Sequence, residues 1–226
     1  MSDSTRQIVT IDGPAGVGKS TVSRGLAHIL GFTYLDTGAM YRAIAYGCHS
    51  RGCDVSNGDE VAQLLPAFSI SLRTPDKPDD DVRVYLNNKE ISAFIRTPEM
   101  GSLASQVSAH GPVRSLLTSL QQEIGRKGKI VAEGRDTGTV VFPYAAWKFY
   151  LDATPENRAQ RRVKQLRENG EEADEQNILA MIKQRDTDDK ERSLAPLKPA
   201  QDAVYIDSTT ITAAQVITLM LSYISL

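Results

Sequence analysis

The sequence predicts an α/β fold in which helices cover a parallel β-sheet. Short apolar runs, each followed by turn residues and then by a helical pattern, recur along the 226 residues. Several runs are nearly continuous in apolar residues, as in strands that are buried on both faces. Strands that alternate with helices in this way favour a parallel sheet. We expect five central strands, at residues 7–12, 33–36, 130–133, 147–151 and 203–206.

Length and composition indicate one main domain with room for a small insert. Apolar residues make up 41% of the chain and charged residues 24%, which is typical of soluble globular proteins. The formal charge of −2 gives no overall basic field for a nucleic acid polymer. The first seven residues lack the apolar core of a signal peptide, and the apolar stretch 216–226 is too short to span a bilayer. We expect a cytoplasmic monomer without a membrane partner.

Cys48 and Cys53 are the only cysteines of the chain. No further Cys or His pair completes a zinc cage, so reduced structural thiols are the expected state. His28, His49 and His110 are scattered and do not have the spacing of a helical metal motif.

The first strand leads into a phosphate-binding loop. The segment GPAGVGKS matches G-x-x-x-x-G-K-[ST] and precedes the helical pattern TVSRGLAHIL. Backbone amides and the helix N-terminus can cradle phosphates there, Lys19 can reach the β and γ phosphates, and Ser20 can ligate Mg²⁺. We therefore expect ATP to contact Gly13, Pro14, Ala15, Gly16, Val17, Gly18, Lys19, Ser20 and Thr21.

Other interpretations of this loop fit the sequence less well. A chance Gly-rich turn would not need four specified residues in a strand-to-helix context. A dinucleotide-binding G-x-G-x-x-G would need glycine at Ala15 or Thr21. A GTPase is disfavoured because NNKE, at 87–90, is followed by Ile91, where an Asn-Lys-x-Asp motif has the aspartate that reads guanine.

The second strand ends in LDTGAMYRAI, which predicts a helix near residues 38–52. Asp36 or Thr37 can cap this helix, and Tyr41 and Arg42 fall within its first turns. Arg42 is thereby placed near the carboxyl edge of the sheet, where open α/β sheets bind ligands. The alternative is an ordinary surface arginine on a solvated helix.

An alternating pattern at residues 68–92 predicts a small antiparallel insert. It lies between the helix near 38–52 and a helix near 98–109, so it should project from one edge of the sheet and could cover a substrate. We expect a core of residues 1–66 and 107–226, with 67–106 as the inserted element.

The third strand, IVAEGRD, places three charged residues at the same edge of the sheet. Arg135 can clamp a phosphate, Asp136 can accept from an exocyclic amine, and Glu133 stands where a Walker-B acid could order Mg²⁺ through water. A plain N-cap is the alternative role for Asp136.

A lid is expected at about 154–175. Thr154 can cap a helix that begins at Pro155 and ends at Gly170. A second charged helix, near 174–192, leads to the last strand and to an amphipathic helix from residue 213. Arg158, Arg161 and Arg162 can share one helix face, which is either a solvated surface or a contact for ATP phosphates.

Taken together, the segments IDGPAGVGKST, LDTGAMYR, ASQVSA with Arg114, EGRDTGTVVFPYA and RDTDDKERSLAPL resemble bacterial cytidylate kinases. The resemblance runs from residue 8 to about 217. It implies a P-loop three-layer fold with a five-stranded parallel sheet, a monophosphate-binding insert and a helical lid. It also implies transfer of a phosphate from ATP, with Mg²⁺, to CMP and dCMP.

The resemblance further implies roles for individual residues. Ser105, Arg114 and Asp136 are similar to the cytosine readers of the family. Asp189 is similar to its ribose ligand, and Thr37 and Tyr41 also belong to the substrate site. The ligands of the acceptor phosphate would be Arg42, Arg135 and Arg192, with Arg185 close to ribose and phosphate. The catalytic set would then be Lys19, Arg135, Arg185 and Arg192, with Arg158 and Arg162 on ATP.

Two rival functions remain open at this stage. A P-loop kinase for an alcohol such as shikimate or a sugar acid would need a carboxylate base and fewer acceptor-side arginines. A nucleotide-dependent switch would bind ATP or GTP without any acceptor.

Overall fold

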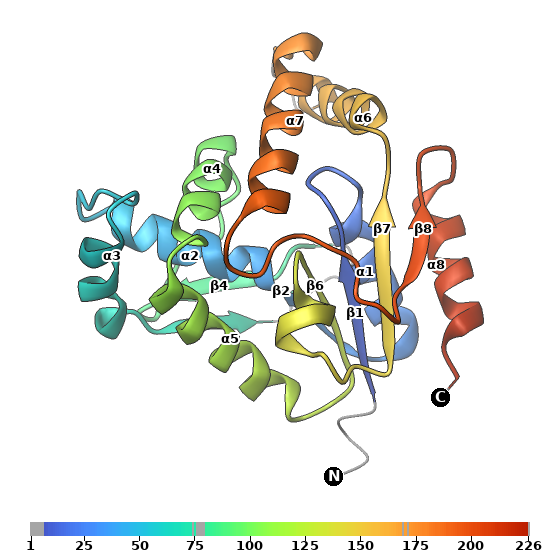
Figure 1. The fold of residues 1–226 in the computed structure, drawn as a ribbon, viewed down its shortest axis with the longest axis horizontal. Coiled ribbons are helices and arrows are strands. Elements are labelled where there is room, and N and C mark those ends of the chain that lie inside the picture. Colours follow the sequence, from blue (N-terminus) through green and yellow to red (C-terminus); the bar gives the residue numbers. More distant parts are fainter. Residues whose placement is uncertain (1–6, 74, 76–79, 169, 171, 226) are drawn as a thin grey trace.

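The computed structural model describes residues 7–73, 75, 80–168, 170 and 172–225 (Figure 1). Its central sheet has five parallel strands in the order β2-β6-β1-β7-β8. Each strand lies within one residue of its predicted bounds, so the predicted sheet is confirmed. The strands are β1 (Ile8–Asp12), β2 (Thr33–Asp36), β6 (Ile130–Gly134), β7 (Trp147–Asp152) and β8 (Val204–Asp207).

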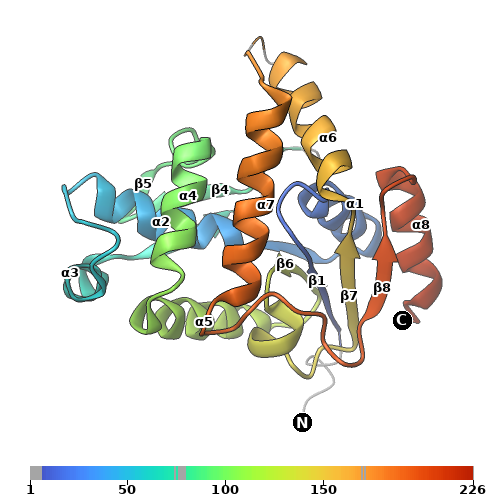
Figure 2. The same cartoon turned by 45° about the horizontal axis from the view of Figure 1, so that its top comes forward.

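Helices cover both faces of this sheet because successive strand residues point to opposite sides. On one face, Val9 and Ile11 pack into a cluster with residues of α1 (Lys19–Leu30) and α8 (Ala213–Tyr223). On the other, Ile8 joins a cluster with α2 (Thr37–His49) and α5 (Gly111–Gly125). The result is a three-layer core, visible in Figures 1 and 2.

The insert forms its own three-stranded antiparallel sheet, as predicted. Its strands are β3 (Ile70–Arg73), β4 (Arg83–Leu86) and β5 (Lys89–Glu90), and they do not join the central sheet. Asn87 and Asn88, with φ of 50° and 64°, make the tight turn between β4 and β5. The segment 75–81, rich in Pro and Asp, lies between β3 and β4 and only partly within the described residues.

Three helices flank the insert. The first is α3 (Gly58–Leu64), capped by Asn57 and followed by a short 3-10 turn (Leu65–Ala67). The helix predicted near 98–109 is α4 (Pro98–Val107), which packs against α2. A separate helix, α5, follows at once, because Pro112 starts a new first turn where no amide donor is missed. Neither α3 nor α5 was predicted.

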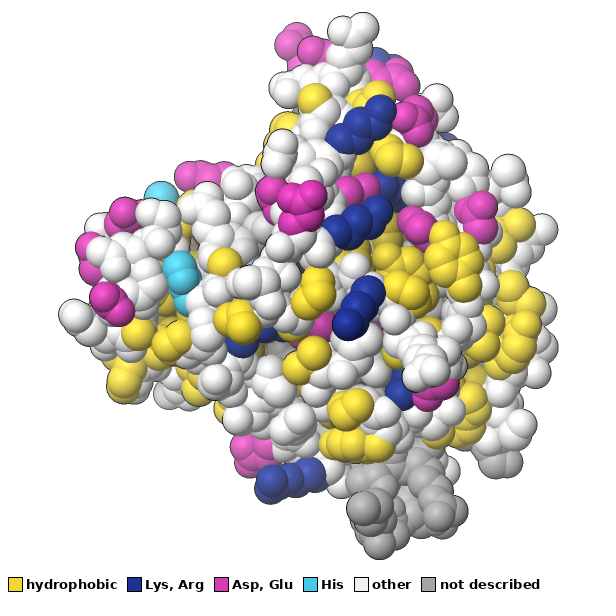
Figure 3. Space-filling model, viewed as in Figure 1, with side chains coloured by type: hydrophobic (Ala, Val, Ile, Leu, Met, Phe, Trp, Pro, Cys, Tyr) yellow, Lys and Arg dark blue, Asp and Glu magenta, His cyan; other side chains and the backbone are white. Residues whose placement is uncertain are grey.

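Two helices rise together beyond the carboxyl ends of the strands (Figures 1 and 2). They are α6 (Pro155–Glu168) and α7 (Glu175–Glu191), and their connection includes residues 169 and 171, which lie outside the described residues. Thr154 Oγ1 accepts from the Asn157 amide at 3.3 Å, which confirms the predicted cap. Basic side chains, with acidic ones beside them, lie over α7 on the face in Figure 3.

The ends of β1 and β6 are joined by a buried carboxylate. Asp12 accepts from the Thr137 amide at 2.8 Å, from the Thr137 hydroxyl at 2.7 Å and from the Gly138 amide at 2.7 Å. These bonds fix the five-residue turn Thr137–Val141 next to the loop that follows β1. The loops that carry the predicted site therefore start from one rigid edge.

Both cysteines are free, as expected. Within the described residues, the helices are too short or too polar for any of them to cross a lipid bilayer.

Candidate active site at the carboxyl edge of the sheet

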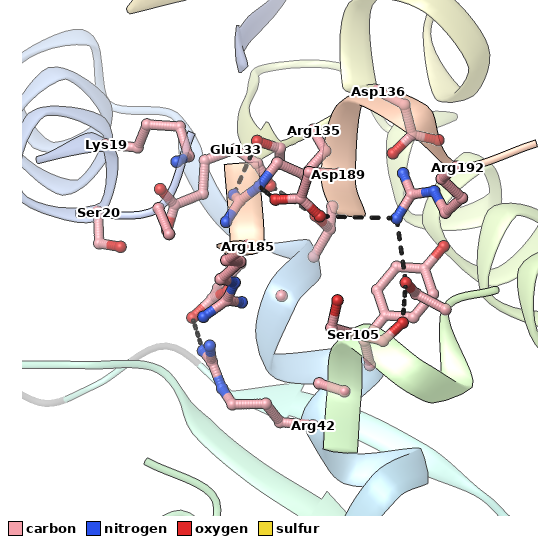
Figure 4. A pocket seen from close by; sticks show the side chains of 18 of the residues that line it. Lys19, Ser20, Arg42, Ser105, Glu133, Arg135, Asp136, Arg185, Asp189 and Arg192 are labelled. Atoms are coloured by element: carbon pink, nitrogen blue, oxygen red, sulfur yellow. Dashed lines mark hydrogen bonds and ion pairs between the residues drawn. The ribbon is translucent and has the colours of Figure 1, made fainter. Parts of the chain in front are cut away.

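A cavity of about 230 Å³ opens at the carboxyl edge of the central sheet, beneath α7. The loop after β1 and the start of α1 form one end, and α2, α4, α5 and the segment after β6 form the other. In Figure 4, Lys19 and Ser20 lie on one side, and Ser105, Asp136 and Arg192 lie on the opposite side. The cavity therefore has two ends that differ in chemistry.

The phosphate-binding loop leaves no room for side chains at its first turn. A Cβ atom at Gly13 would lie 2.0 Å from the Leu151 carbonyl oxygen, so only glycine fits there. Gly18, at φ 96°, turns the chain into α1. The Lys19 ammonium folds back over the loop and donates to the Pro14 carbonyl at 2.6 Å. Burial, together with nearby Arg135, lowers the pKa of Lys19 to about 7.

Two arginines of α6 donate to backbone carbonyls of this loop. The Arg158 side chain is only 2% exposed and pairs with both carboxylate oxygens of Asp186 in α7. It also donates to the Ala15 carbonyl at 3.0 Å. Arg161 donates to backbone oxygens near Ser208, whereas Arg162 is partly exposed and contacts Gln165. The three arginines thus do not share one solvated face, and Arg158 links the loop to α7.

Between the two ends of the cavity, two arginines have guanidinium donors that no described group accepts. Asp36 caps α2 by accepting from the Ala39 amide at 2.8 Å, and it also binds the Arg42 guanidinium at 3.2 Å. Among the described groups, the Nε atoms of Arg42 and Arg185 are buried without a hydrogen-bond partner. Burial and nearby Arg135 lower the pKa of Arg185 to about 10. Buried guanidinium donors without partners are suited to an anionic ligand.

Asp189 connects two of the predicted phosphate ligands. Arg135 donates to it at 2.7 Å, and Arg192 lies 3.9 Å away. Burial alone would raise the pKa of Asp189, but the charge and hydrogen bond of Arg135 hold it below its usual value. The pair therefore stays charged, and Asp189 aims Arg135 across the cavity.

The far end of the cavity holds a buried ion pair. Arg114 of α5 donates to Asp136, and both side chains are less than 10% exposed. Arg114 also donates to the Ser108 carbonyl at 3.2 Å and lies over the Tyr41 ring, 5.7 Å from its centre. Asp136 occupies the N-cap position of the turn Thr137–Val141 but makes no capping bond with its side chain. Its carboxylate is directed to the site instead.

Glu133, at the end of β6, is buried beside the phosphate loop. Tyr34 donates to one of its carboxylate oxygens, Oε1. The other oxygen, Oε2, is buried and has no hydrogen-bond partner among the described groups. Burial and the charge of Asp36 raise the pKa of Glu133. A carboxylate oxygen left open next to Ser20 fits a hydrated cation.

The structure brings most of the predicted site residues to this cavity. It is lined by Ala15, Gly16, Lys19, Ser20, Thr37, Tyr41, Arg42, Ser105, Arg114, Arg135, Asp136, Arg185, Asp189 and Arg192. Other predicted residues of the phosphate loop and the first turn of α1 do not line the cavity: Gly13, Pro14, Val17, Gly18 and Thr21. The cavity lining also does not include Arg158 or Arg162.

Two residues that bind the site's arginines were not predicted to do so. The sequence indicated Asp36 only as a helix cap, but Asp36 also binds Arg42. It gave no signal for Ser108, whose hydroxyl accepts from Arg192 at 3.0 Å. Thr37, a predicted substrate-site residue, donates its hydroxyl to the Glu133 carbonyl at 2.6 Å and so also holds the end of β6.

Comparison with known proteins gives consistent matches over nearly the whole chain. A family model described as cytidylate kinase matches residues 9–226. The cytidylate kinase of Citrifermentans bemidjiense is 44% identical over 213 residues, which cover 94% of this chain and 90% of that protein. Cytidylate kinase 1 of Haemophilus influenzae is 43% identical over 217 residues, covering 96% and 93%.

A solved structure of an uncharacterized protein from Eubacterium ventriosum is similar in fold. It has a TM-score of 0.50 and 11% identity, covering 96% of this chain and 98% of that one. At this identity the likeness concerns the fold alone.

Proposed function

The chain belongs to the cytidylate kinase family, and we propose that it transfers the γ-phosphate of ATP to CMP, and also to dCMP, giving CDP or dCDP and ADP. The observation that carries the proposal is one cavity with a phosphate loop at one end and the buried Arg114–Asp136 pair at the other. Between these ends lie guanidinium donors without a partner among the described residues. This arrangement suits two nucleotides that meet through their phosphates.

The donor end binds the ATP phosphates. Backbone amides of residues 13–20 and the N-terminus of α1 supply partial positive charge, and Lys19 supplies a full charge. To reach a phosphate, the Lys19 ammonium exchanges its bond to the Pro14 carbonyl for one to the β or γ oxygens. Arg162 and Arg158 complete the donor site when the lid closes and excludes water.

The acceptor end binds the nucleoside monophosphate. Arg42, Arg135 and Arg192 hold its phosphate, and Arg185 lies close to its ribose and phosphate. Asp189 binds the ribose hydroxyls, while Thr37 and Tyr41 complete the wall. The buried Nε donors of Arg42 and Arg185 support this assignment, because an anionic oxygen would satisfy them.

The transfer itself needs no protein base. The second pKa of a phosphate monoester is near 6, so the attacking oxygen is already largely anionic at neutral pH. The residues Lys19, Arg135, Arg185 and Arg192 align the two phosphates and stabilise the charge that spreads over the transferred group. Catalysis therefore consists of positioning and electrostatic stabilisation.

The residues at the donor end fit a magnesium ion. Ser20 would ligate it directly, and the open oxygen of Glu133 would hold it through water. When bound with ATP, Mg²⁺ neutralises charge on the β and γ phosphates. The chain contributes the orientation of these two side chains.

Cytosine is recognised at the far end by Ser105, Arg114 and Asp136. Asp136 accepts a hydrogen bond from the exocyclic amine of cytosine, which uracil replaces with a carbonyl. Two acceptors cannot form this bond, so UMP should be a poor substrate.

The substrate assay tests this proposal directly. Purified protein with Mg²⁺ and ATP is mixed separately with CMP, dCMP, UMP, AMP and shikimate, and ADP formation is followed. We expect ADP with CMP and dCMP, and much less with UMP. If shikimate were the only acceptor that led to ADP formation, the protein would be an alcohol kinase. If ATP were hydrolysed at the same rate without any acceptor, a nucleotide-dependent switch would be indicated.

Asp136→Ala tests the recognition of the base. We expect the ratio of kcat/KM for CMP over UMP to fall by 10-fold or more, roughly the effect of one lost hydrogen bond in a buried site. The variant also leaves the buried Arg114 without its carboxylate partner, so its folding is checked by thermal denaturation. A preserved ratio in a folded variant would remove Asp136 from cytosine recognition.

A further inference from the structure

A tyrosine outside the predicted site touches the acidic residue at the donor end. Tyr34 lies on β2 and pairs with Val131 of β6, two residues before Glu133. Side chains two residues apart on a strand share a face, so the Tyr34 ring and the Glu133 carboxylate are diagonal neighbours on the sheet. Tyr34 donates its hydroxyl proton to Glu133 Oε1.

The two carboxylate oxygens of Glu133 thus have different surroundings. Oε1 is held by Tyr34, whereas Oε2 is buried and without a partner among the described groups. Glu133 is 4% exposed and lines the cavity together with Lys19 and Ser20. A buried carboxylate oxygen without a partner is costly, and a bound cation or its water shell would satisfy it.

The neighbouring groups leave that oxygen available. The Lys19 ammonium donates to the Pro14 carbonyl. Ser20 lines the same end of the cavity as Glu133. Tyr34 and Glu133 are held by neighbouring strands of the sheet, and Ser20 lies in the first turn of α1 at the same end of the cavity.

We propose that Tyr34 is a positioning residue for magnesium binding, whose hydroxyl holds the Glu133 carboxylate in the orientation that presents Oε2 beside Ser20. Partners that orient a metal-binding group in this way commonly affect metal affinity 10-fold to 100-fold. The inference rests on the proposed donor site. It adds that the effect of Mg²⁺ on ATP affinity depends on Tyr34 of β2, which is not among the residues proposed to contact the phosphates.

Tyr34→Phe removes the hydroxyl and keeps the ring. The dissociation constant of ATP is measured by calorimetry in EDTA and in excess Mg²⁺, and the ratio of the two is the magnesium gain. We expect the gain to fall roughly tenfold in Tyr34→Phe, with the affinities for metal-free ATP and for CMP unchanged within about twofold. A structural role alone would weaken all three affinities.

Tyr144→Phe is the matched control, because this side chain is 54% exposed and does not line the cavity. It should bind like the wild type. Glu133→Gln and the double variant complete a double-mutant cycle. If Tyr34 acts through Glu133, the double variant loses no more of the gain than Glu133→Gln does. If Tyr34→Phe does not fold, Glu133→Asp, which withdraws the carboxylate from the hydroxyl, should show the same loss.

An unchanged magnesium gain in folded Tyr34→Phe would overturn the proposal, as would additive losses in the cycle. A wild-type protein whose ATP affinity does not respond to Mg²⁺ would also overturn it. CMP-dependent ADP formation is measured on the same preparation. If the wild type forms ADP with CMP but Tyr34→Phe has the same magnesium gain as the wild type, the role of Tyr34 is rejected and the kinase function stands. If the wild type forms no ADP with CMP, the kinase function itself is rejected.

Discussion

At the scale of single residues, the cavity is defined by charges that are only partly compensated. Lys19 donates to a backbone carbonyl, and the buried Nε donors of Arg42 and Arg185 have no partner within the part of the chain that the structure describes. Such groups are unfavourable in the free protein because they have lost contact with water without gaining a hydrogen bond. Anionic phosphates would supply the missing hydrogen bonds, so part of the binding free energy comes from groups that the fold has already buried.

The lowered pKa of Lys19 has a measurable consequence. With a pKa of about 7 in the free protein, the amine is largely neutral at pH 8. ATP phosphates favour the ammonium form, so binding at this pH should take up roughly one proton, and ATP affinity should fall as pH rises from about 7 to 9. Calorimetry in two buffers of different ionisation enthalpy measures the uptake.

Lys19→Met is the control for this prediction, because it has no amine to titrate. Its ATP binding should be weaker and should take up no proton at pH 8. Binding of ATP to the wild type without proton uptake would mean that Lys19 is already charged in the free protein.

At the scale of secondary-structure elements, single residues serve both the helix and the site. Asp36 caps α2 and also holds Arg42, with Arg96 at 3.8 Å. Asp36→Asn keeps an N-cap acceptor and loses the charge, whereas Asp36→Ala loses both. We expect Asp36→Ala to cost about 1 kcal/mol of unfolding free energy and Asp36→Asn much less. Both should weaken CMP binding, because Arg42 loses its anchor.

Urea denaturation and CMP titration separate these two effects. If Asp36→Asn bound CMP as tightly as the wild type, the carboxylate would serve the helix only.

The lid helix provides a second test at this scale. Arg158 is buried against Asp186, so Arg158→Gln should destabilise the protein by about 3 kcal/mol through the unpaired carboxylate. Arg162 is partly exposed, so Arg162→Gln should leave stability unchanged and should lower turnover if Arg162 reaches ATP on closure. Full turnover after replacing Arg158, Arg161 and Arg162 together would refute the proposed donor contacts.

The elements differ in how far the sequence predicted them. The five central strands were found because several of them are nearly continuous apolar runs, each followed by a helical pattern, and the phosphate loop was found because its motif residues lie within one short segment. Helix α5 was missed, although Val113 and Leu117 follow helical spacing and are buried. The burial of Arg158 could not be predicted, because its partner Asp186 is 28 residues away on another helix and a run of arginines usually indicates a solvated face.

At the scale of the whole molecule, the fold brings segments from residue 15 to residue 192 to one edge of the sheet. The insert and the lid lie on different sides of that edge (Figure 2), so each can close over one nucleotide. The division of the chain into a core of residues 1–66 and 107–226, an insert of 67–106 and a lid at about 154–175 remains a prediction. The proposed transfer depends on both nucleotides occupying the same cavity from opposite ends.

A crystal structure with CMP and a non-hydrolysable ATP analogue tests that claim most directly. We predict cytosine against Ser105, Arg114 and Asp136, and the triphosphate in the loop around Lys19, with the two phosphate groups facing each other. Cytosine bound elsewhere, or the triphosphate outside the loop, would contradict the account.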